Sequence, residues 1–177
     1  MCGIAGIFNP NGVSKESLKL MSDAISHRGP DAEGFFTDDN FGLAHRRLSI
    51  IDLSTAANQP MQSHNGRYWM AFNGEVYNYV EIRSELEGMG YSFNTASDTE
   101  VILRAYHAWG ISCLERFIGM WAFALLDVPH RRLVLSRDRF GIKPLYYARI
   151  PGGWAFGSEI KGMLRAGGLS PVPNSGV

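Results

Sequence analysis

Short runs rich in apolar residues, bounded by glycine, proline and other turn-forming residues, recur along the chain and predict β-strands. They lie at residues 3–8, 34–37, 42–50, 68–72, 121–126, 132–136, 145–149 and 154–157. The last four are separated in pairs by Val128-Pro129-His130 and by Pro151-Gly152-Gly153. Because such short segments favour turns between antiparallel strands, we predict two hairpins in this half of the chain.

Three other segments place apolar residues at helical spacing. They are 17–26, with Ser14 as a candidate N-cap, 80–87, which ends before Gly88, and a segment that begins at Ser97 and stops at Gly110. The third opens with Ser97-Asp98-Thr99-Glu100, which fits a capping box. Strands outnumber helices and are mostly neighbours in sequence, so the predicted class is α+β, with antiparallel sheets and helices packed outside them.

Composition agrees with a packed globular domain: the chain has 177 residues, of which 45% are hydrophobic and 19% charged. Seventeen Lys and Arg residues balance seventeen Asp and Glu residues, so no basic field exists to attract nucleic acid. The most apolar stretch, 118–126, is about half the roughly 20 residues that a membrane span needs. We therefore expect no nucleic acid partner, no membrane contact, no signal peptide, and a cytoplasmic location.

The end of the chain differs from the rest in composition. Residues 167–177 are rich in Gly, Ser and Pro and show no hydrophobic period, which is typical of a linker. We therefore predict one domain over 1–166 and a linker over 167–177 that leads toward a further domain outside this chain.

Cys2 is the residue with the most useful chemistry. Removal of Met1 would leave a thiol and a free α-amine on the same residue. The thiol, with a pKa of about 8.5, is a nucleophile, and the α-amine, with a pKa of about 7.7–8.0, can serve as its base without a histidine. The alternative is that Cys2 is only a small residue opening a buried strand.

A series of motifs in fixed order favours the first interpretation. The motifs are 1–8 (MCGIAGIF), 27–31 (HRGPD), 44–52 (AHRRLSIID), 59–61 (QPM), 72–79 (FNGEVYNY), 97–100 (SDTE), 119–124 (GMWAFA) and 137–146 (RDRFGIKPLY). Together they closely resemble the glutaminase domain of asparagine synthetase-like proteins, within the class II glutamine amidotransferases, from Met1 to about Leu164. The resemblance implies an N-terminal-nucleophile fold, a four-layer αββα sandwich of two mainly antiparallel sheets.

The resemblance also implies roles for six residues. Cys2 attacks the side-chain amide of glutamine, and Asn73 and the Gly74 N–H stabilise the resulting oxyanion. Arg47 matches the position that binds the substrate α-carboxylate, and Glu75 and Asp98 match positions that hold its α-ammonium group. From the residues alone, simpler interpretations stay open.

Those simpler interpretations are structural. Arg47 would be a surface strand residue beside Arg46, Glu75 a solvated turn residue after the turn-forming pair Asn73-Gly74, and Asp98 a helix N-cap.

Several other residues attract attention and are assigned structural roles. His27 and His45 are expected to hold loops near the pocket, and Cys113 is expected to be an inert core thiol. Met120, Trp121 and Phe123 are expected in the core. The charged segment 137–146 is either a solvated hairpin turn or, as the resemblance implies, the part of the domain that faces a synthetase partner.

The resemblance implies partners that this chain lacks. Glutamine is the expected substrate, and a C-terminal synthetase domain, in cis or else in trans, is expected to receive the ammonia. No cofactor or metal is expected in this domain, and ATP and Mg are expected only in the absent synthetase domain. Three alternatives stay open: a sugar or phosphoribosyl acceptor, an inactive assembly module, and a homodimer.

Overall fold

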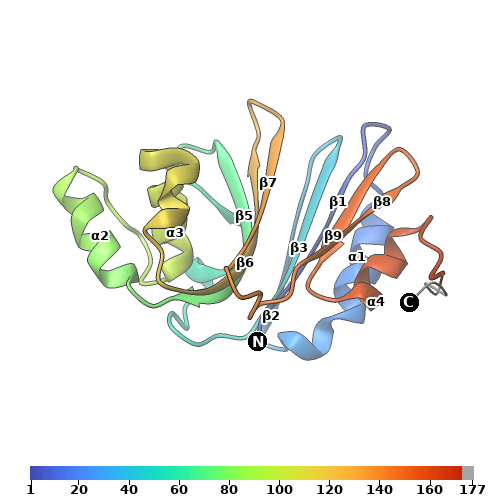
Figure 1. The fold of residues 1–177 in the computed structure, drawn as a ribbon, viewed down its shortest axis with the longest axis horizontal. Coiled ribbons are helices and arrows are strands. Elements are labelled where there is room, and N and C mark those ends of the chain that lie inside the picture. The colour runs from blue at the N-terminus through green and yellow to red at the C-terminus, as the bar shows by residue number, and fades with distance from the viewer. Residues whose placement is uncertain (173–177) are drawn as a thin grey trace.

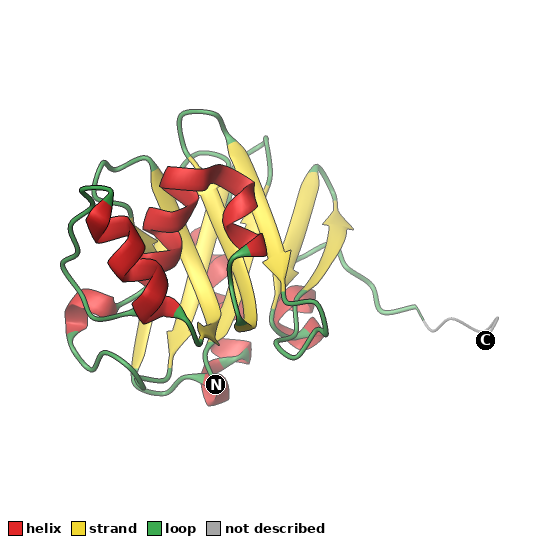
Figure 2. Cartoon of the chain, turned by 60° about the vertical axis from the view of Figure 1, so that its left-hand side comes forward, coloured by secondary structure: helices red, strands yellow, loops and turns green. Residues whose placement is uncertain are grey.

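Two antiparallel β-sheets lie face to face, and helices cover both outer faces, in the computed structural model that describes residues 1–172 (Figure 1). Helices α2 (Tyr79–Gly88) and α3 (Asp98–Trp109) cover one sheet. Helices α1 (Lys15–Ala24) and α4 (Ile160–Met163) cover the other. In the turned view of Figure 2, the helices on the near side lie across the strands beneath them. The predicted α+β class and the four-layer αββα arrangement are confirmed.

Each sheet is built from antiparallel neighbours. The first sheet has the order β2-β3-β1-β9-β8, and the second has the order β4-β5-β6-β7. The strands are β1 (Gly3–Phe8), β2 (Ala32–Thr37), β3 (Phe41–Arg47), β4 (Met61–Gln62), β5 (Tyr68–Val76), β6 (Gly119–Asp127), β7 (Arg132–Arg137), β8 (Tyr146–Ile150) and β9 (Gly153–Gly157). Both predicted hairpins are present, since β6 pairs with β7 and β8 pairs with β9. The two-residue strand β4 and the short helix α4 were not predicted.

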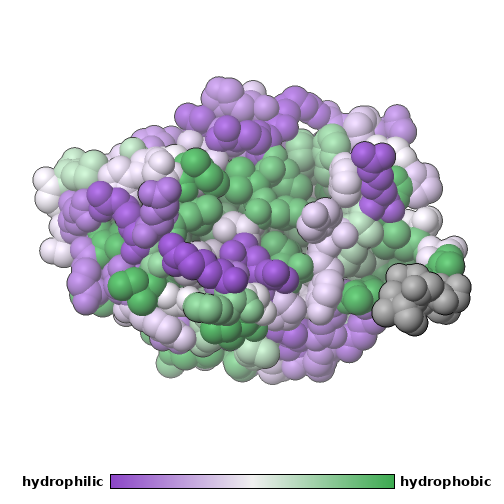
Figure 3. Space-filling model, in the orientation of Figure 1, coloured by the Kyte–Doolittle hydropathy of each residue, from purple (hydrophilic) through white to green (hydrophobic). Residues whose placement is uncertain are grey.

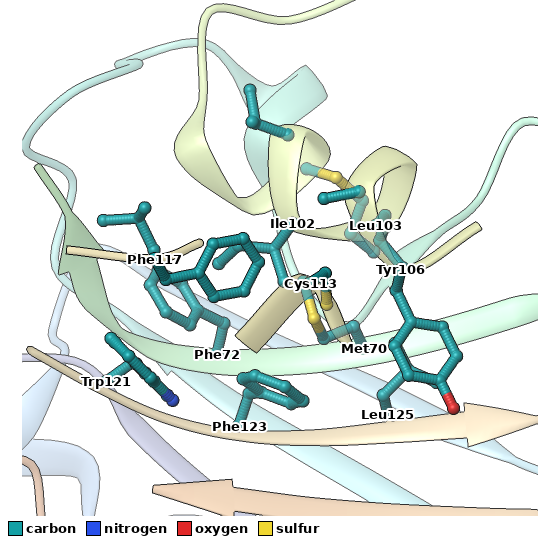
Figure 4. Packing of buried hydrophobic residues seen from close by; sticks show 14 of the residues in the cluster. Met70, Phe72, Ile102, Leu103, Tyr106, Cys113, Phe117, Trp121, Phe123 and Leu125 are labelled. Atoms are coloured by element: carbon teal, nitrogen blue, oxygen red, sulfur yellow. The ribbon is translucent and has the colours of Figure 1, made fainter. Parts of the chain in front are cut away.

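Apolar side chains fill all three spaces between the layers. The largest cluster packs α2 and α3 on the second sheet, with Met70, Phe72, Ile102, Phe123 and Leu125 among its members (Figure 4). A middle layer between the sheets contains Phe41, Leu43, Ala124, Leu126 and Phe156. The third cluster, with Leu18, Met21 and Ile25 from α1 and the segment after it, seals the first sheet. Close packing of these three apolar clusters restricts the movement of the strands that carry them.

Two strand boundaries differ from prediction in ways that matter for function. The strand predicted over 42–50 ends at Arg47. The strand predicted over 68–72 continues to Val76, so Asn73 and Gly74 are paired with β6 and do not form a turn. A turn-forming pair is overridden here because the neighbouring strand supplies nine matched positions along β5.

The helix boundaries are close to prediction, with one change in the start of α3. Helix α1 begins two residues earlier than expected, and Ser14 caps it by accepting the Ser17 N–H. In α3 the Ser97 hydroxyl accepts the Glu100 N–H, as a capping box requires. The reciprocal bond is absent from the described contacts, because the Glu100 carboxylate accepts the N–H groups of Asn94 and Thr95 instead.

The segment 137–146 is not a hairpin turn. It carries the chain from β7 in one sheet to β8 in the other. Of the predicted linker, residues 167–172 form no helix or strand, Leu169 packs against the cluster beneath α1, and residues 173–177 lie outside the described residues. Among the described helices, none is long and apolar enough to cross a membrane.

The central role of the second sheet in packing gives a stability prediction. Phe123, on β6, is fully buried in the cluster between the second sheet and its covering helices, whereas Phe140 is 88% exposed in the loop after β7. We expect Phe123→Ala to lower the free energy of unfolding by about 3–5 kcal/mol, because it leaves a cavity. The matched control Phe140→Ala should change it by less than about 0.5 kcal/mol. Urea denaturation followed by far-UV circular dichroism measures both, and equal losses would contradict this layer assignment.

Candidate active site

A cavity of about 110 Å³ opens at the end of the sandwich where β1 starts and β3 ends. All six residues for which the sequence predicted a role line this cavity, although they come from four separate parts of the chain. They are Cys2, Arg47, Asn73, Gly74, Glu75 and Asp98. The fold therefore brings the predicted residues together.

Cys2 precedes β1, and sheet pairing determines its neighbours. Gly3 pairs with Arg46 on β3, which places the thiol beside the end of β3. The Cys2 Sγ accepts the Leu48 N–H at 3.3 Å and lies 3.5 Å from the Leu48 carbonyl, to which the S–H can donate. Burial raises the pKa of the Cys2 thiol, while the Leu48 N–H and the positive charges of the amino terminus and Arg47 oppose that shift. The thiol needs a base to become a nucleophile.

Arg47 is a buried cation, not a surface strand residue. Its guanidinium donates to the Ser54 carbonyl at 2.8 Å, to Asn58 Oδ1 at 2.7 Å, and to the Asp52 carbonyl. All three acceptors are uncharged groups. Within residues 1–172, no carboxylate lies within 4.0 Å of it. A buried guanidinium with no ionic partner is suited to bind an anion that enters the cavity.

Asn73 carries a hydrogen-bond donor with no partner. The residue is 1% exposed, and its Nδ2 is buried without a partner in the described part of the chain. Leaving a buried amide donor unpaired costs about 1–3 kcal/mol, which a bound acceptor would recover. Next to it, a Cβ on Gly74 would lie 2.3 Å from the Met120 carbonyl oxygen. Only glycine therefore allows β6 to approach the strand at this point.

Two carboxylates share the other side of the cavity. Asp98 opens α3, and its Oδ2 accepts the Val76 N–H at 3.2 Å. Because Ser97 provides the N-cap, Asp98 is not needed for that function. The pKa of Asp98 is raised to about 6, mainly by burial and in smaller part by the nearby Glu75 carboxylate, while backbone hydrogen bonds oppose the shift. Glu75 lies in strand β5, so it is not a turn residue.

The structure adds lining residues that the sequence analysis did not single out. The Gln59 side chain accepts the Phe72 N–H at 2.6 Å and donates to Thr99 Oγ1 at 3.2 Å, and so ties β5 to α3. Gln59 belongs to the motif 59–61, which was the available indication. Lys143, from the charged segment 137–146, also lines the cavity. Met120 was predicted to be a core residue, but it is half-buried and lines the cavity as well.

The described lining of this cavity contains no histidine. His45 is buried, its Nε2 lies 3.0 Å from the Phe72 carbonyl, and burial lowers its pKa to about 4. His45 therefore connects strands of opposite sheets. The sequence had indicated instead that it holds a loop near the pocket. His27 pairs with Glu159 at 2.9 Å. Cys113 is fully buried, and burial raises the pKa of its thiol to about 12, which confirms an unreactive core thiol.

A larger cavity lies elsewhere and contains none of the six predicted residues. It has a volume of about 810 Å³ and opens between the edge strands β7 and β8. Apolar surface is visible between the two sheets in Figure 3. The lining of this larger cavity is mainly aromatic and aliphatic, with two arginines and one histidine. The lining residues are Phe8, Phe41, His130, Arg131, Arg132, Leu133, Leu135, Tyr147, Trp154, Ala155 and Phe156. Chemistry, not size, therefore identifies the candidate active site.

Comparison with solved structures supports the same fold. The glutamine phosphoribosylpyrophosphate amidotransferase from B. subtilis, complexed with ADP and GMP, superposes with a TM-score of 0.79 over 94% of this chain and 44% of that one. An allosteric regulatory enzyme of purine biosynthesis gives a TM-score of 0.77. Sequence identity to these structures is 20% and 21%, so they establish similarity of fold alone.

Sequence relatives are more similar. The glutamine-hydrolyzing asparagine synthetase 1 of Bacillus subtilis is 44% identical over 171 residues, which cover 94% of this chain and 27% of the relative. A putative asparagine synthetase 2 of Methanocaldococcus jannaschii is 39% identical over 93% of this chain and 35% of the relative. The chain thus spans about a third or less of these proteins. A family model described as a glutamine amidotransferase domain matches residues 1–175. The chain belongs to the glutamine amidotransferase domain family.

Proposed function

We propose that this chain hydrolyses the side-chain amide of glutamine to glutamate and ammonia, with Cys2 as nucleophile. The observation that carries the proposal is the unpartnered, buried Asn73 amide in the same cavity as the Cys2 thiol. A nucleophile beside an unused hydrogen-bond donor is the arrangement that acyl transfer needs. Arg47, Glu75 and Asp98 add binding groups for an amino acid in the same space.

The reaction proceeds in two halves. After Met1 is removed, the Cys2 α-amine takes the thiol proton, and the sulfur attacks the carbonyl carbon of the amide. The tetrahedral intermediate collapses, the C–N bond breaks, and the amine returns a proton to the leaving ammonia. Water then attacks the γ-glutamyl thioester, with the same amine as base, and the C–S bond breaks to release glutamate and restore the thiol.

Charge development explains the need for the polar groups. Each tetrahedral intermediate places negative charge on the former carbonyl oxygen. The Asn73 Nδ2 and the Gly74 N–H would donate to that oxygen, and a donor held in place before the reaction has no reorganisation cost. Hydrogen bonds from these two donors would be strongest in the transition state, where the oxygen carries most charge, so they would contribute mainly to turnover.

Recognition of glutamine uses one protein charge of opposite sign for each of the two charged groups on its α-carbon. The Arg47 guanidinium would bind the α-carboxylate, and Asp98 with Glu75 would bind the α-ammonium group. The bound ammonium group would keep Asp98 ionised despite its burial, because an opposite charge lowers the pKa of a carboxyl group.

The ammonia product defines the partner that we propose. Ammonia released into water near neutral pH becomes largely protonated and loses its nucleophilicity, so direct transfer to an acceptor site is favourable. The named relatives are about three or more times as long as this chain. We propose that a synthetase domain, in cis, receives the ammonia, and that ATP and Mg act in that domain. A cytoplasmic location remains part of this proposal.

The nucleophile is tested by substitution of each cysteine. We expect Cys2→Ala to abolish ammonia release from glutamine, because no other described group in the cavity is a thiol. Cys113→Ala, the same change in a buried core thiol, should retain activity at temperatures where the protein is folded. A coupled glutamate dehydrogenase assay measures release, and intact mass confirms removal of Met1. Normal turnover by Cys2→Ala would exclude the mechanism.

The oxyanion donor has a different kinetic effect. We expect Asn73→Ala to reduce kcat by about 10²–10³, or roughly 3–4 kcal/mol, with little change in KM. Asn65→Ala, in an exposed turn between β4 and β5, is the matched control and should leave both constants unchanged. A variant whose KM rises while kcat is constant would assign Asn73 to ground-state binding.

The raised pKa of Asp98 predicts the pH dependence of glutamine binding. Below about pH 6 the free carboxyl is protonated and cannot pair with the ammonium group, so affinity should fall about tenfold per pH unit. Calorimetric titration of the inactive Cys2→Ala variant between about pH 4.5 and about pH 8, which brackets this pKa, measures binding without turnover. In Cys2→Ala with Asp98→Asn, binding should be weaker by about tenfold or more at pH 8, and the loss below pH 6 should disappear. Identical profiles would remove Asp98 from substrate binding.

A further inference from the structure

Lys143 is a buried cation at the amino-terminal end of the cavity. Its side chain is held in the loop after β7, the residue is 7% exposed, and it lines the cavity together with Met1 and Cys2. Its Nζ lies 3.1 Å from the Met1 Sδ, which belongs to an uncharged thioether. Over residues 1–172, no carboxylate lies within 4.0 Å of this ammonium group. Burial of an unpaired charge is costly, which points to a use.

The loop that carries Lys143 is rigidly attached to β6. The Asp138 carboxylate accepts the N–H groups of Phe140, Ile142 and Lys143 at 3.0–3.1 Å, and also the Trp121 N–H at 3.2 Å. Four donors on one carboxylate hold the loop backbone in one conformation. The fold therefore determines the backbone position from which the Lys143 side chain extends into the cavity.

The position of Nζ relates directly to the mature amino terminus. The Cγ, Cβ, Cα and carbonyl carbon atoms of Met1 separate the Met1 Sδ from the Cys2 nitrogen. Bond lengths then place Nζ within roughly 10 Å of that nitrogen. When Met1 is removed, the thioether contact is lost, and the cavity contains the Lys143 ammonium and the new α-amine.

The other charged groups near the amino terminus either have hydrogen-bond or ionic partners within the protein or are the groups proposed to bind the substrate. The Arg28 guanidinium donates to the Cys2 carbonyl and pairs with Glu159. The Arg47 guanidinium is directed to the loop after β3. Among the acidic groups, Glu75, Asp98 and Asp52 line the cavity, with Asp52 bonded to the Ser54 and Ala96 N–H groups.

We propose that Lys143 is a positioning residue for the nucleophile, and that its positive charge promotes loss of the proton that the Cys2 thiol and the mature α-amine share. This inference rests on the proposed function. The resting pair is a thiol and an ammonium group, and the reactive pair carries one proton less, as thiol with amine or as thiolate with ammonium. A nearby cation favours the form with less positive charge, whichever of the two carries the proton. Lys143 therefore increases the reactive fraction at neutral pH without contact with the substrate.

The test is a pH profile of Cys2 reactivity that does not depend on turnover. In the 177-residue chain with Met1 removed, iodoacetamide alkylation of Cys2 is followed by mass spectrometry of the N-terminal peptide, which excludes Cys113. We expect Lys143→Met to move the midpoint of this profile up by about one pH unit, and to move the acid limb of kcat/KM for glutamine by the same amount. Lys143→Arg, which keeps the charge, should retain the original midpoint.

The matched control is Arg139→Met, which removes an exposed positive charge from the same loop. Solvent screens that charge, so the profile should not move. An unchanged midpoint in Lys143→Met, or equal shifts in both variants, would overturn the proposal. If Lys143→Met does not fold, Lys143→Gln provides the same comparison. If the alkylation midpoint shifts in Lys143→Met but the wild-type chain does not hydrolyse glutamine, the proposed function is removed and the electrostatic role of Lys143 stays in place.

Discussion

The pairing of β1 with β3 is the interaction on which the candidate active site depends. β1 is hydrogen-bonded on both edges, to β3 and β9, so the first strand of the chain lies in the middle of a sheet. The register Gly3 to Arg46 brings Cys2 to the end of β3, beside Arg47 and Leu48. A slip of one residue would turn alternate side chains to the opposite face and separate the thiol from the guanidinium.

The second sheet and α3 supply the groups that act on the other side of the cavity. β5 contributes Asn73, Gly74 and Glu75, and the capped start of α3 contributes Asp98. Apolar packing of α3 on the sheet determines the distance between these groups, because Ile102 and its neighbours cannot move without opening the core. In the described part of the chain, the apolar core between α3 and the sheet contains no reactive group, but it determines where the polar groups of the cavity lie.

Several features of this cavity are unfavourable for stability and useful for catalysis. The Asn73 amide lacks a partner, and the Arg47 and Lys143 cations are buried with no carboxylate within 4.0 Å in the described chain. Asp98 titrates at a raised pKa because it is removed from water. Such groups persist where the surrounding core is stable enough to hold them, and in the proposed function a bound zwitterionic ligand would pair with Asn73, Arg47 and Asp98.

The sequence by itself determined the class of fold, both hairpins, the capped start of α3 and, through motifs in fixed order, the six residues expected in the site. Local patterns are sufficient for the fold class, the hairpins and the cap because period and capping act over a few residues, whereas the six site residues followed from the family resemblance. It did not determine that Asn73-Gly74 continues a strand, since only pairing with β6 overrides the turn preference of that pair. Nor did it determine that Lys143 reaches the cavity or that His45 joins the two sheets. Those placements depend on contacts between residues far apart in the chain, which only the packed layers create.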